Sequence, residues 1–346
     1  MLSRVANTFY WMVRYVERAD NLARLVDVNQ HLLLDFESLD SERLRDFWQP
    51  IISSTGDEEV FHEIYQNAGS HEVIHFLTDD PNNPNSIRSC IALARENART
   101  VRDQLSDELW EELNSLYLFS QSDEAERLIV ENPSRYYEAI RTGVMTFHGI
   151  ASSTIARNEA WEFMDLGRHL ERADKTTRFL DISSYLAKPS NGHGSMHQEE
   201  SLHWTAILRS CSAMGAMRQK KNEANARNAI DLLIFDRDFP RSVRYCVERV
   251  DLCLHMISGS PRGSFANEAE RESGKLFADL NYGSTRDVFS IGLHAFLDDL
   301  QARFNTIGEQ VFESFVLMPE RLQDKPVLTP QPLSAAAAWQ QAQQQQ

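Results

Sequence analysis

Cysteine is scarce in this sequence, and its few thiols form no recognisable framework. The 346 residues include four cysteines, Cys90, Cys211, Cys246 and Cys253, and no Cys-x-x-Cys pair. Sparse thiols in helical contexts are expected to be reduced and buried, which argues against a disulfide scaffold and a thiolate metal site. We therefore expect the protein to work in the cytoplasm.

Long apolar runs and a secretory leader are also missing. No apolar stretch reaches the roughly 18 residues of a membrane-spanning helix. Residues 1–13 lack the charged, apolar and cleavable regions of a signal peptide. We expect a soluble protein.

Positive charge is in deficit. Thirty-five Lys and Arg residues face 51 Asp and Glu residues, a formal net charge of −16. Because such a chain repels phosphate backbones and anionic lipid surfaces, we expect neither nucleic acid nor membrane as a partner. A phosphate-binding Gly-x-x-x-x-Gly-Lys-Ser/Thr loop, a nucleophile elbow and repeated Glu-x-x-His pairs are absent too. We expect no cofactor.

Alternating apolar and polar residues, the pattern of strands, are nearly absent, whereas helical spacing is frequent. Phe9, Met12, Val16, Ala19 and Ala23 recur at intervals of three and four. The sequence predicts an all-α fold. We expect helices around residues 6–38, 41–54, 57–68, 71–78, 85–104, 107–120, 134–156, 158–187, 200–218, 221–235, 241–258 and 285–315.

Two blocks of the sequence occur twice. Residues 14–20 read Arg-Tyr-Val-Glu-Arg-Ala-Asp, and residues 168–174 read Arg-His-Leu-Glu-Arg-Ala-Asp. The pattern Asp-x-x-x-Pro-x-Ser-Ile/Val-Arg-x-Cys covers residues 80–90 and returns at 236–246. Because both blocks return after nearly the same interval, we infer an internal duplication.

The duplication predicts the domain organisation. We expect an internally duplicated multi-helix bundle in which the long helices 6–38 and 158–187 are central. Residues 1–155 form the first half, and residues 156–327 form a second half that packs on it. The Pro, Ala and Gln content of residues 328–346 predicts a disordered tail.

The two long helices carry the candidate site. Large apolar residues surround the first helix on nearly all sides, so its charges must be paired or must line a polar cavity. Spacing allows pairs between Arg14 and Glu17 and between Asp20 and Arg24. The second copy offers Arg168 with Glu171 and Asp174 with Arg178 at the same spacings. The candidate binding residues are Arg14, Glu17, Arg18, Asp20, Arg24, Arg168, Glu171, Arg172, Asp174 and Arg178, with Glu96 and Arg99 as further contributors.

Two interpretations of these charges remain open. In the first, the charges form an ion-pair network that locks the two halves together. In the second, both helices present Glu and Arg to a shared cleft, where Arg holds a carboxylate or phosphate. For Glu96 and Arg99 the simpler interpretation is a solvated helix face.

The ordered combination of motifs resembles the bacterial Alpha-E family of all-helical proteins, which is named for its Glu-Arg motif. The resemblance rests on Glu17-Arg18 and Glu171-Arg172, on residues 94–105 with 110–114, and on residues 239–243. It covers roughly residues 1 to 320 and leaves out the tail.

The resemblance implies partners rather than a defined reaction. Members of this family are commonly encoded beside a circularly permuted ATP-grasp ligase, a transglutaminase-like cysteine peptidase and a proteasome-like peptidase. It therefore implies a helical partner or substrate-holding component of an ATP-grasp amide-ligase system, one that synthesises or modifies peptides. Arginine side chains suit such a role because they bind carboxylates with two hydrogen bonds.

Two catalytic alternatives stay open. The protein could be an enzyme in its own right, with Glu17 or Glu171 as acid or base beside arginines. His71-Glu72-Val-Ile-His75 matches the zinc-protease pattern, in which two imidazoles one helical turn apart bind the metal. The short segment after His75 and the lack of this pattern in the second copy argue against zinc.

Overall fold

The computed structural model describes residues 1–34, 41–186 and 196–317, and these residues form helices and no strand. The predicted all-α fold is confirmed. The predicted tail, residues 328–346, lies outside the described residues. The division of the chain between residues 155 and 156 falls in the turn between two helices and stays a prediction.

The structure forms the following helices in its first part: α1 (Ser3–Leu34), α2 (Ser41–Thr55), α3 (Glu58–Ile64), α4 (Ser70–Thr78), α5 (Ile87–Thr100), α6 (Asp107–Ser120), α7 (Asp123–Glu131) and α8 (Pro133–Thr154). The second part contains α9 (Glu159–Leu186), α10 (Met196–Ser210), α11 (Met214–Gln219), α12 (Ala226–Ile230), α13 (Val243–Ser258), α14 (Glu268–Tyr282), α15 (Thr285–Ile291) and α16 (Leu293–Phe312). Short helical turns add η1 (Arg102–Gln104), η2 (Asp231–Phe235) and η3 (Glu313–Leu317).

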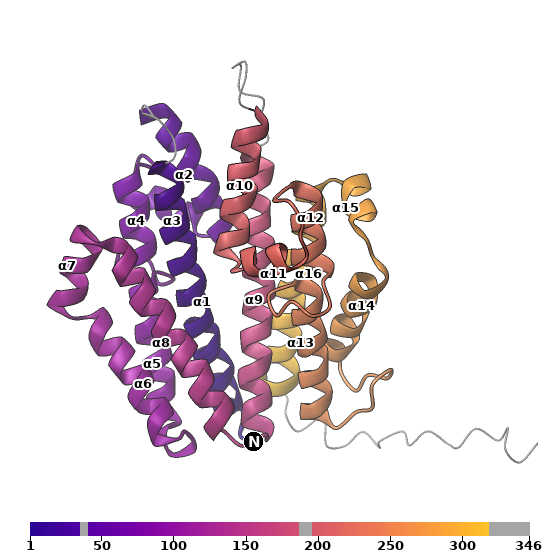
Figure 1. The fold of residues 1–346 in the computed structure, drawn as a ribbon. Helices are drawn as coiled ribbons and strands as arrows, with labels where there is room; N and C mark the ends of the chain where they lie inside the picture. The colour runs from indigo at the N-terminus through magenta and orange to yellow at the C-terminus, as the bar shows by residue number, and fades with distance from the viewer. Residues whose placement is uncertain (35–40, 187–195, 318–346) are drawn as a thin grey trace, which may run out of the picture.

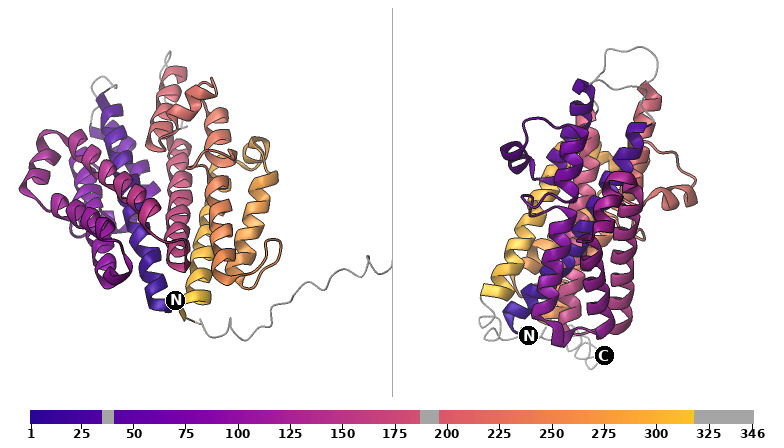
Figure 2. Two further views of the ribbon diagram at one scale, coloured as in Figure 1. Left: turned by 60° about the horizontal axis from the view of Figure 1, so that its bottom comes forward. Right: turned by 90° about the vertical axis from the view of Figure 1, so that its left-hand side faces the viewer.

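Helices α1 and α9 have 32 and 28 residues and lie side by side (Figure 1). Helix α5 packs against α1, and α13 packs against α9. Helices α8 and α16 cover opposite faces of this layer (Figure 2). The polar side chains of α1 and α9 are therefore enclosed by helices from both parts of the chain.

Residues of the repeated blocks start α5 and α13 in the same way. The hydroxyl of Ser86 accepts a hydrogen bond from the amide of Ser89, and that of Ser242 accepts one from the amide of Tyr245. Each serine thus satisfies an amide that the first helical turn leaves unpaired. The repeated sequence fixes where both helices begin.

Several helix boundaries differ from the sequence prediction. Helices α7 and α14 were not expected. The predicted helix 285–315 is divided at Gly292, whose φ of 99° places it outside the helical region. The predicted helix 200–218 is interrupted at Ser212, where φ is 55°. Within the described residues, no helix combines the length and apolarity that crossing a membrane requires.

A glycine allows the two long helices to approach closely. A Cβ atom at Gly167 of α9 would lie 2.5 Å from the carbonyl oxygen of Tyr10 of α1. No side chain fits at that distance, so any larger residue must push the helices apart. Buried Phe9, Val13 and Leu166 pack in the same region of the core.

We predict that Gly167→Ala lowers the free energy of unfolding by about 1–3 kcal/mol, because overpacking forces α1 and α9 apart. Gly149→Ala on α8 is the matched control, since no atom lies within 4 Å of the new Cβ. It should raise stability by up to about 1 kcal/mol through helix propensity. Urea denaturation followed by circular dichroism measures the free energy of unfolding of both variants. Equal changes in the two variants would contradict the close approach of α1 and α9 at Gly167.

Candidate functional site

The two Glu-Arg segments exchange partners between α1 and α9. Arg172 Nε lies 2.7 Å from Glu17 Oε1, and Arg172 Nη2 lies 2.8 Å from Glu17 Oε2. In the reverse direction, Arg18 donates to Glu171 at 2.7 and 3.1 Å. Both carboxylates are 0% exposed. Two-point pairing of this kind satisfies both oxygens of each buried carboxylate.

Glu171 binds further cations. Arg14 Nε lies 2.8 Å from Glu171 Oε2, and Lys175 Nζ lies 3.9 Å from Oε1. Arg14 also donates to the Tyr10 hydroxyl at 2.8 Å and lies 4.7 Å above the Trp11 ring. The predicted pair between Arg14 and Glu17 is wrong, because Arg14 reaches across to α9.

Glu17 collects a different set. Arg241 lies 3.4 Å from Glu17 Oε1, while His148 Nε2 lies 3.2 Å from Oε2. Arg168, which the repeat relates to Arg14, stays 3.9 Å away. Glu17 is thus surrounded by groups from α8, from α9 and from the segment before α13.

These contacts keep both glutamates ionised. Burial alone would raise the pKa of Glu17, but Arg172 and Arg241 hold it well below its usual range. Burial opposes ionisation of Glu171 as well, yet Arg18 and Arg14 lower its pKa. A carboxyl with a lowered pKa is ionised near neutral pH, which makes it a poor proton donor there. Each carboxylate instead binds the arginine of the other long helix.

The aspartates of the two segments form the predicted pairs within each helix. Arg24 Nε lies 2.9 Å from Asp20 Oδ2, and Arg178 Nε lies 2.8 Å from Asp174 Oδ2. Arg241 adds a second contact to Asp20 at 2.6 Å. The charged residues therefore form two ion-pair networks, one around Glu17 and one around Glu171, and each contains residues of both α1 and α9.

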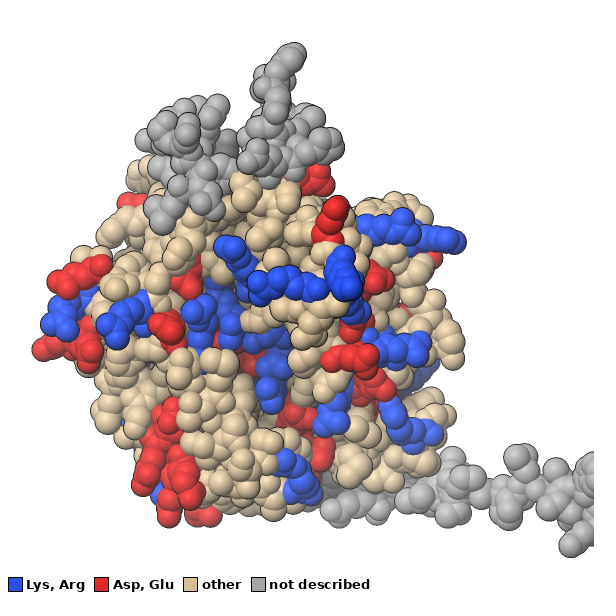
Figure 3. Space-filling model, in the orientation of Figure 1, with Lys and Arg blue, Asp and Glu red and all other residues tan. Residues whose placement is uncertain are grey.

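On the face that carries α8, Lys and Arg side chains gather in the middle (Figure 3). A cavity of 360 Å³ opens between α1, α8 and α9, and we call it the α8 pocket. Its lining consists of Asp20, Arg24, Val144, Met145, His148, Gly149, Ser152, Arg168, Arg172 and Arg241.

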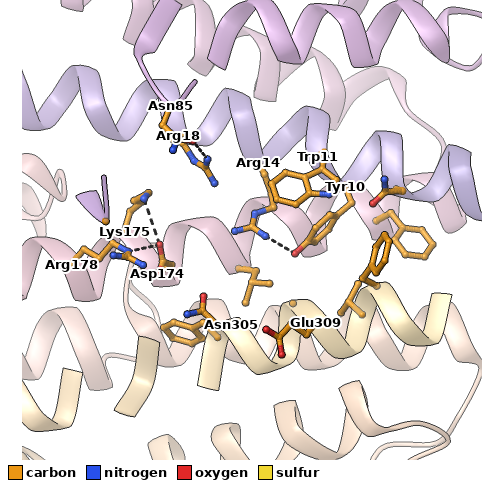
Figure 4. Close-up of a pocket in the computed structure, with 18 of the residues that line it drawn as sticks. Tyr10, Trp11, Arg14, Arg18, Asn85, Asp174, Lys175, Arg178, Asn305 and Glu309 are labelled. Atoms are coloured by element: carbon orange, nitrogen blue, oxygen red, sulfur yellow. Dashed lines mark hydrogen bonds and ion pairs between the residues drawn. The ribbon is translucent and has the colours of Figure 1, made fainter. Parts of the chain in front are cut away.

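The opposite face holds a larger cavity of 680 Å³, which we call the α16 pocket (Figure 4). One end is polar and is formed by Arg14, Arg18, Asp57, Asn85, Asp174, Lys175 and Arg178, with Asn305 and Glu309 of α16 opposite. The remaining wall is largely apolar and includes Trp11, Phe163, Leu170, Phe304, Val311, Phe312 and Val316.

The polar end of the α16 pocket has donors to spare. Lys175 Nζ lies 3.6 Å from Asp174 Oδ2 and, in the part of the chain described, makes no hydrogen bond. Burial lowers its pKa, which Asp174 and Glu171 partly counteract. Asn85 accepts a hydrogen bond from Arg18 and donates one to Asp57 at 2.7 Å. The amide of Asn85 is thus engaged, whereas the ammonium group of Lys175 can still donate to a ligand.

The predicted site residues thus divide between two pockets instead of sharing one cleft. Arg14, Arg18, Asp174 and Arg178 line the α16 pocket, whereas Asp20, Arg24, Arg168 and Arg172 line the α8 pocket. Glu17 and Glu171 line neither, because the arginines cover them. Ion pairs between the long helices and cavities lined by arginines therefore occur together, and ligand binding in these cavities stays a prediction.

Comparison with known families agrees with this geometry. A family model described as a predicted alpha-helical domain with a conserved ER motif, Alpha-E, matches residues 1–316. The chain belongs to the Alpha-E family. Its two Glu-Arg segments are the ones that exchange partners between α1 and α9.

The Alpha-E chain is similar to uncharacterized proteins of Mycobacterium bovis and Mycobacterium tuberculosis. Each is 24% identical over 314 residues, which cover 86% of this chain and 35% of the relative. The chain therefore spans about a third of the length of these relatives. No solved structure matches it.

Glu96 and Arg99, which the sequence suggested as further contributors to the site, lie away from both pockets. Glu96 and Arg99 are exposed on α5 and pair with each other at 2.9 Å. They line neither of the two pockets, and their exposure agrees with the simpler interpretation as a solvated helix face.

The zinc-protease pattern lies on α4. His71 is exposed, its ring centre is 6.4 Å from that of His75, and His75 Nδ1 contacts Asp79 Oδ1 at 2.8 Å. Among the described residues, the one group of three His, Cys, Asp or Glu side chains close enough to hold a metal is Asp181, His294 and Asp298. His71, Glu72 and His75 do not belong to it.

Three residues that line the pockets were not predicted from the sequence: Lys175, Arg241 and His148. Lys175 follows the repeated Glu-Arg-Ala-Asp directly, and Arg241 lies between the repeated Pro240 and Ser242. Comparing the two copies for identical residues does not reveal Lys175 and Arg241, because Asn21 and Asn85 occupy the matching positions in the first copy. The signal was the difference between the copies.

We predict that the protein loses stability in two steps as the pH falls. Burial, with Arg168 nearby, lowers the pKa of His148 to about 4 from 6.5. The unfolded chain therefore binds this proton first, and the free energy of unfolding falls between about pH 6.5 and 4. Glu17 and Glu171 have lowered pKa values, so their contribution is present above the ordinary value of 4.5 and is lost below it.

Urea denaturation of wild type and His148→Gln at pH 7 and pH 5 tests the first step. Given the lowered pKa of His148, the free energy of unfolding of wild type should fall by about 2 kcal/mol more than that of the variant between these pH values. His169 also has a lowered pKa, but it is present in both proteins and cancels in the comparison. Parallel losses in the two proteins would contradict the assignment.

Proposed function

We propose that this Alpha-E protein holds a carboxylate-bearing, amino-acid-like substrate in its α16 pocket for an ATP-grasp amide ligase. The observation that carries the proposal is the composition of the pocket, which has paired charges at one end and aromatic and aliphatic side chains along the rest. Its 680 Å³ falls in the range of cavities that bury small ligands.

The charges at the polar end suit a ligand with both an acid and an amine. Arg14 and Arg18 are fixed by Glu171, so little freedom is lost when they bind a carboxylate. The acidic residues Asp57, Asp174 and Glu309 line the same cavity and can accept an ammonium group. An amino acid or a peptide end presents these two groups together.

The other wall supports the same class of ligand. Trp11, Phe163 and Phe304 offer apolar surface next to the charged end. A ligand side chain placed there leaves water, which contributes roughly 25 cal/mol for each Å² buried. Polar groups would orient the ligand, and the apolar wall would supply much of its affinity.

The residues give little support to a reaction performed by this chain alone. Glu17 and Glu171 are locked as carboxylates, as described above. Burial raises the pKa of Cys90, Cys211 and Cys246 to about 12, so these thiols are poor nucleophiles. A partner that activates the bound carboxylate is consistent with these properties.

The partner follows from the family resemblance, which implies a circularly permuted ATP-grasp ligase, with the transglutaminase-like and proteasome-like peptidases as further candidates. The relatives support joint action in a general way. The matched segment makes up 35% of their length, so each joins an Alpha-E segment to further sequence.

We predict that the pocket recognises free carboxylates. The probes are the common amino acids, each as the free acid and as the carboxamide, titrated by isothermal calorimetry. At least one acid should bind at least tenfold more tightly than its amide, because the amide cannot pair with Arg14 and Arg18. Acids and amides that bind equally, or no binding below 10 mM, would refute the proposed ligand.

Lys175→Met and Lys275→Met provide a matched pair of variants for this titration. Lys175 lines the pocket without a hydrogen bond in the described structure, so its loss should leave the fold intact and weaken acid binding several-fold. Lys275 is half-exposed on α14, pairs with Glu272 at 2.7 Å and should not affect binding.

We further predict that the purified protein alone forms no amide bond but increases ATP-dependent amide formation by the cognate ATP-grasp ligase. Mass spectrometry of the product measures the effect. Lys175→Met should still bind the ligase yet fail to stimulate it, because the substrate is no longer held. The partnership fails if wild-type protein at micromolar concentration neither binds the ligase nor changes its rate.

A further inference from the structure

We propose that the α8 pocket is a second ligand site and that it binds a phosphate group. The proposal concerns the face opposite the α16 pocket and does not depend on the function proposed for that pocket. It rests on Arg168, which the protein leaves incompletely paired, and on the excess of positive charge around it.

Arg168 is the first of these observations. The repeat relates it to Arg14, which lies 2.8 Å from Glu171 and donates to Tyr10. Arg168 instead stays 3.9 Å from Glu17, and its Nε is buried without a hydrogen-bond partner among the described residues. An arginine that keeps its donors unused beside a cavity is a ready anion ligand.

The cause lies in the neighbours of Glu17. His148 lies 3.2 Å from Glu17 Oε2, the oxygen that corresponds to the one Arg14 binds on Glu171, and Arg241 lies 3.4 Å from Oε1. The first copy has Asn85 where the second has Arg241. The second copy therefore has an additional cation on this face, where Arg168 stays beyond hydrogen-bond distance of Glu17.

The charges around the α8 pocket do not balance. Arg24, Arg168, Arg172 and Arg241 face the carboxylates Asp20 and Glu17, which leaves two positive charges uncompensated. Around the α16 pocket, four cations face Asp57, Asp174, Glu309 and Glu171, and the charges cancel. In a chain with a net charge of −16, a local excess of this size matches a dianion.

His148 adds a hydrogen-bonding group without adding charge. Its Nε2 is buried and has no partner with hydrogen-bond geometry in the described structure, although Glu17 lies nearby. Burial and the charge of Arg168 keep the imidazole neutral near pH 7, with a pKa of about 4. The uncompensated charge of two is therefore unchanged at physiological pH.

The shape of the α8 pocket favours a compact polar ligand. Its volume is 360 Å³, and its apolar lining is limited to Val144 and Met145. The aromatic wall of the α16 pocket has no equivalent here. Four guanidinium groups and an imidazole around an open recess suit the tetrahedral oxygens of phosphate, whereas a single carboxylate would neutralise only half of the excess charge.

The experiment titrates inorganic phosphate, AMP and acetate into the protein by isothermal calorimetry at constant ionic strength in a phosphate-free buffer. Phosphate or AMP should bind saturably below 10 mM and at least tenfold more tightly than acetate. AMP tighter than phosphate would identify a phosphate ester as the ligand, and equal affinities would identify free phosphate. No saturable binding by either would overturn the proposal.

Two pairs of variants locate the site. Arg168→Gln should weaken phosphate binding at least tenfold, whereas Arg135→Gln removes an exposed arginine from α8 outside the pocket and should leave binding unchanged. Met145 is 56% exposed at the pocket, so Met145→Glu should repel phosphate while Met145→Gln should not, and neither disturbs the ion pairs. Wild-type affinity in both Arg168→Gln and Met145→Glu would overturn the proposal.

Discussion

The exchange of arginines between Glu17 and Glu171 is the interaction on which the rest of the structure depends. Each carboxylate is fully buried and is held by the arginine of the other long helix. A shift of α1 along α9 by one turn would break both pairs at once and leave buried charges unmatched, which costs several kcal/mol for each pair. The exchange therefore fixes the register of the two helices.

A contribution to stability does not by itself account for these buried ion pairs. A buried ion pair contributes little over well-packed apolar residues, because desolvation offsets much of the attraction. What the pairs provide is position. Glu17 holds Arg172 at the α8 pocket, and Glu171 holds Arg14 and Arg18 at the α16 pocket. The glutamates of the ER motif thus act behind the pockets, on the arginines that face them.

The sequence predicted the helical fold, the long helices and the aspartate–arginine pairs, because these depend on spacing within one helix. It could not predict that Arg14 binds Glu171. An arginine can be paired either with a carboxylate of its own helix or with one of another helix, and the spacing in the sequence does not distinguish the two. Lys175 and Arg241 were missed because the repeat draws attention to identical positions. Helix α14 was not predicted, because the Gly- and Ser-containing segment 258–264 that precedes its charged residues has the composition of a loop.

The difference between the two pockets arises outside the repeated motif. Both pockets have floors built from corresponding Arg and Asp positions of α1 and α9, yet their outer walls come from α8 and α16. Helix α8 supplies Met145 and His148, while α16 supplies Phe304, Asn305 and Glu309. Because the floors contain the same residue types, we expect the residues of the covering helix and of positions 85 and 241 to select each proposed ligand. One polar frame can in this way serve two different ligands.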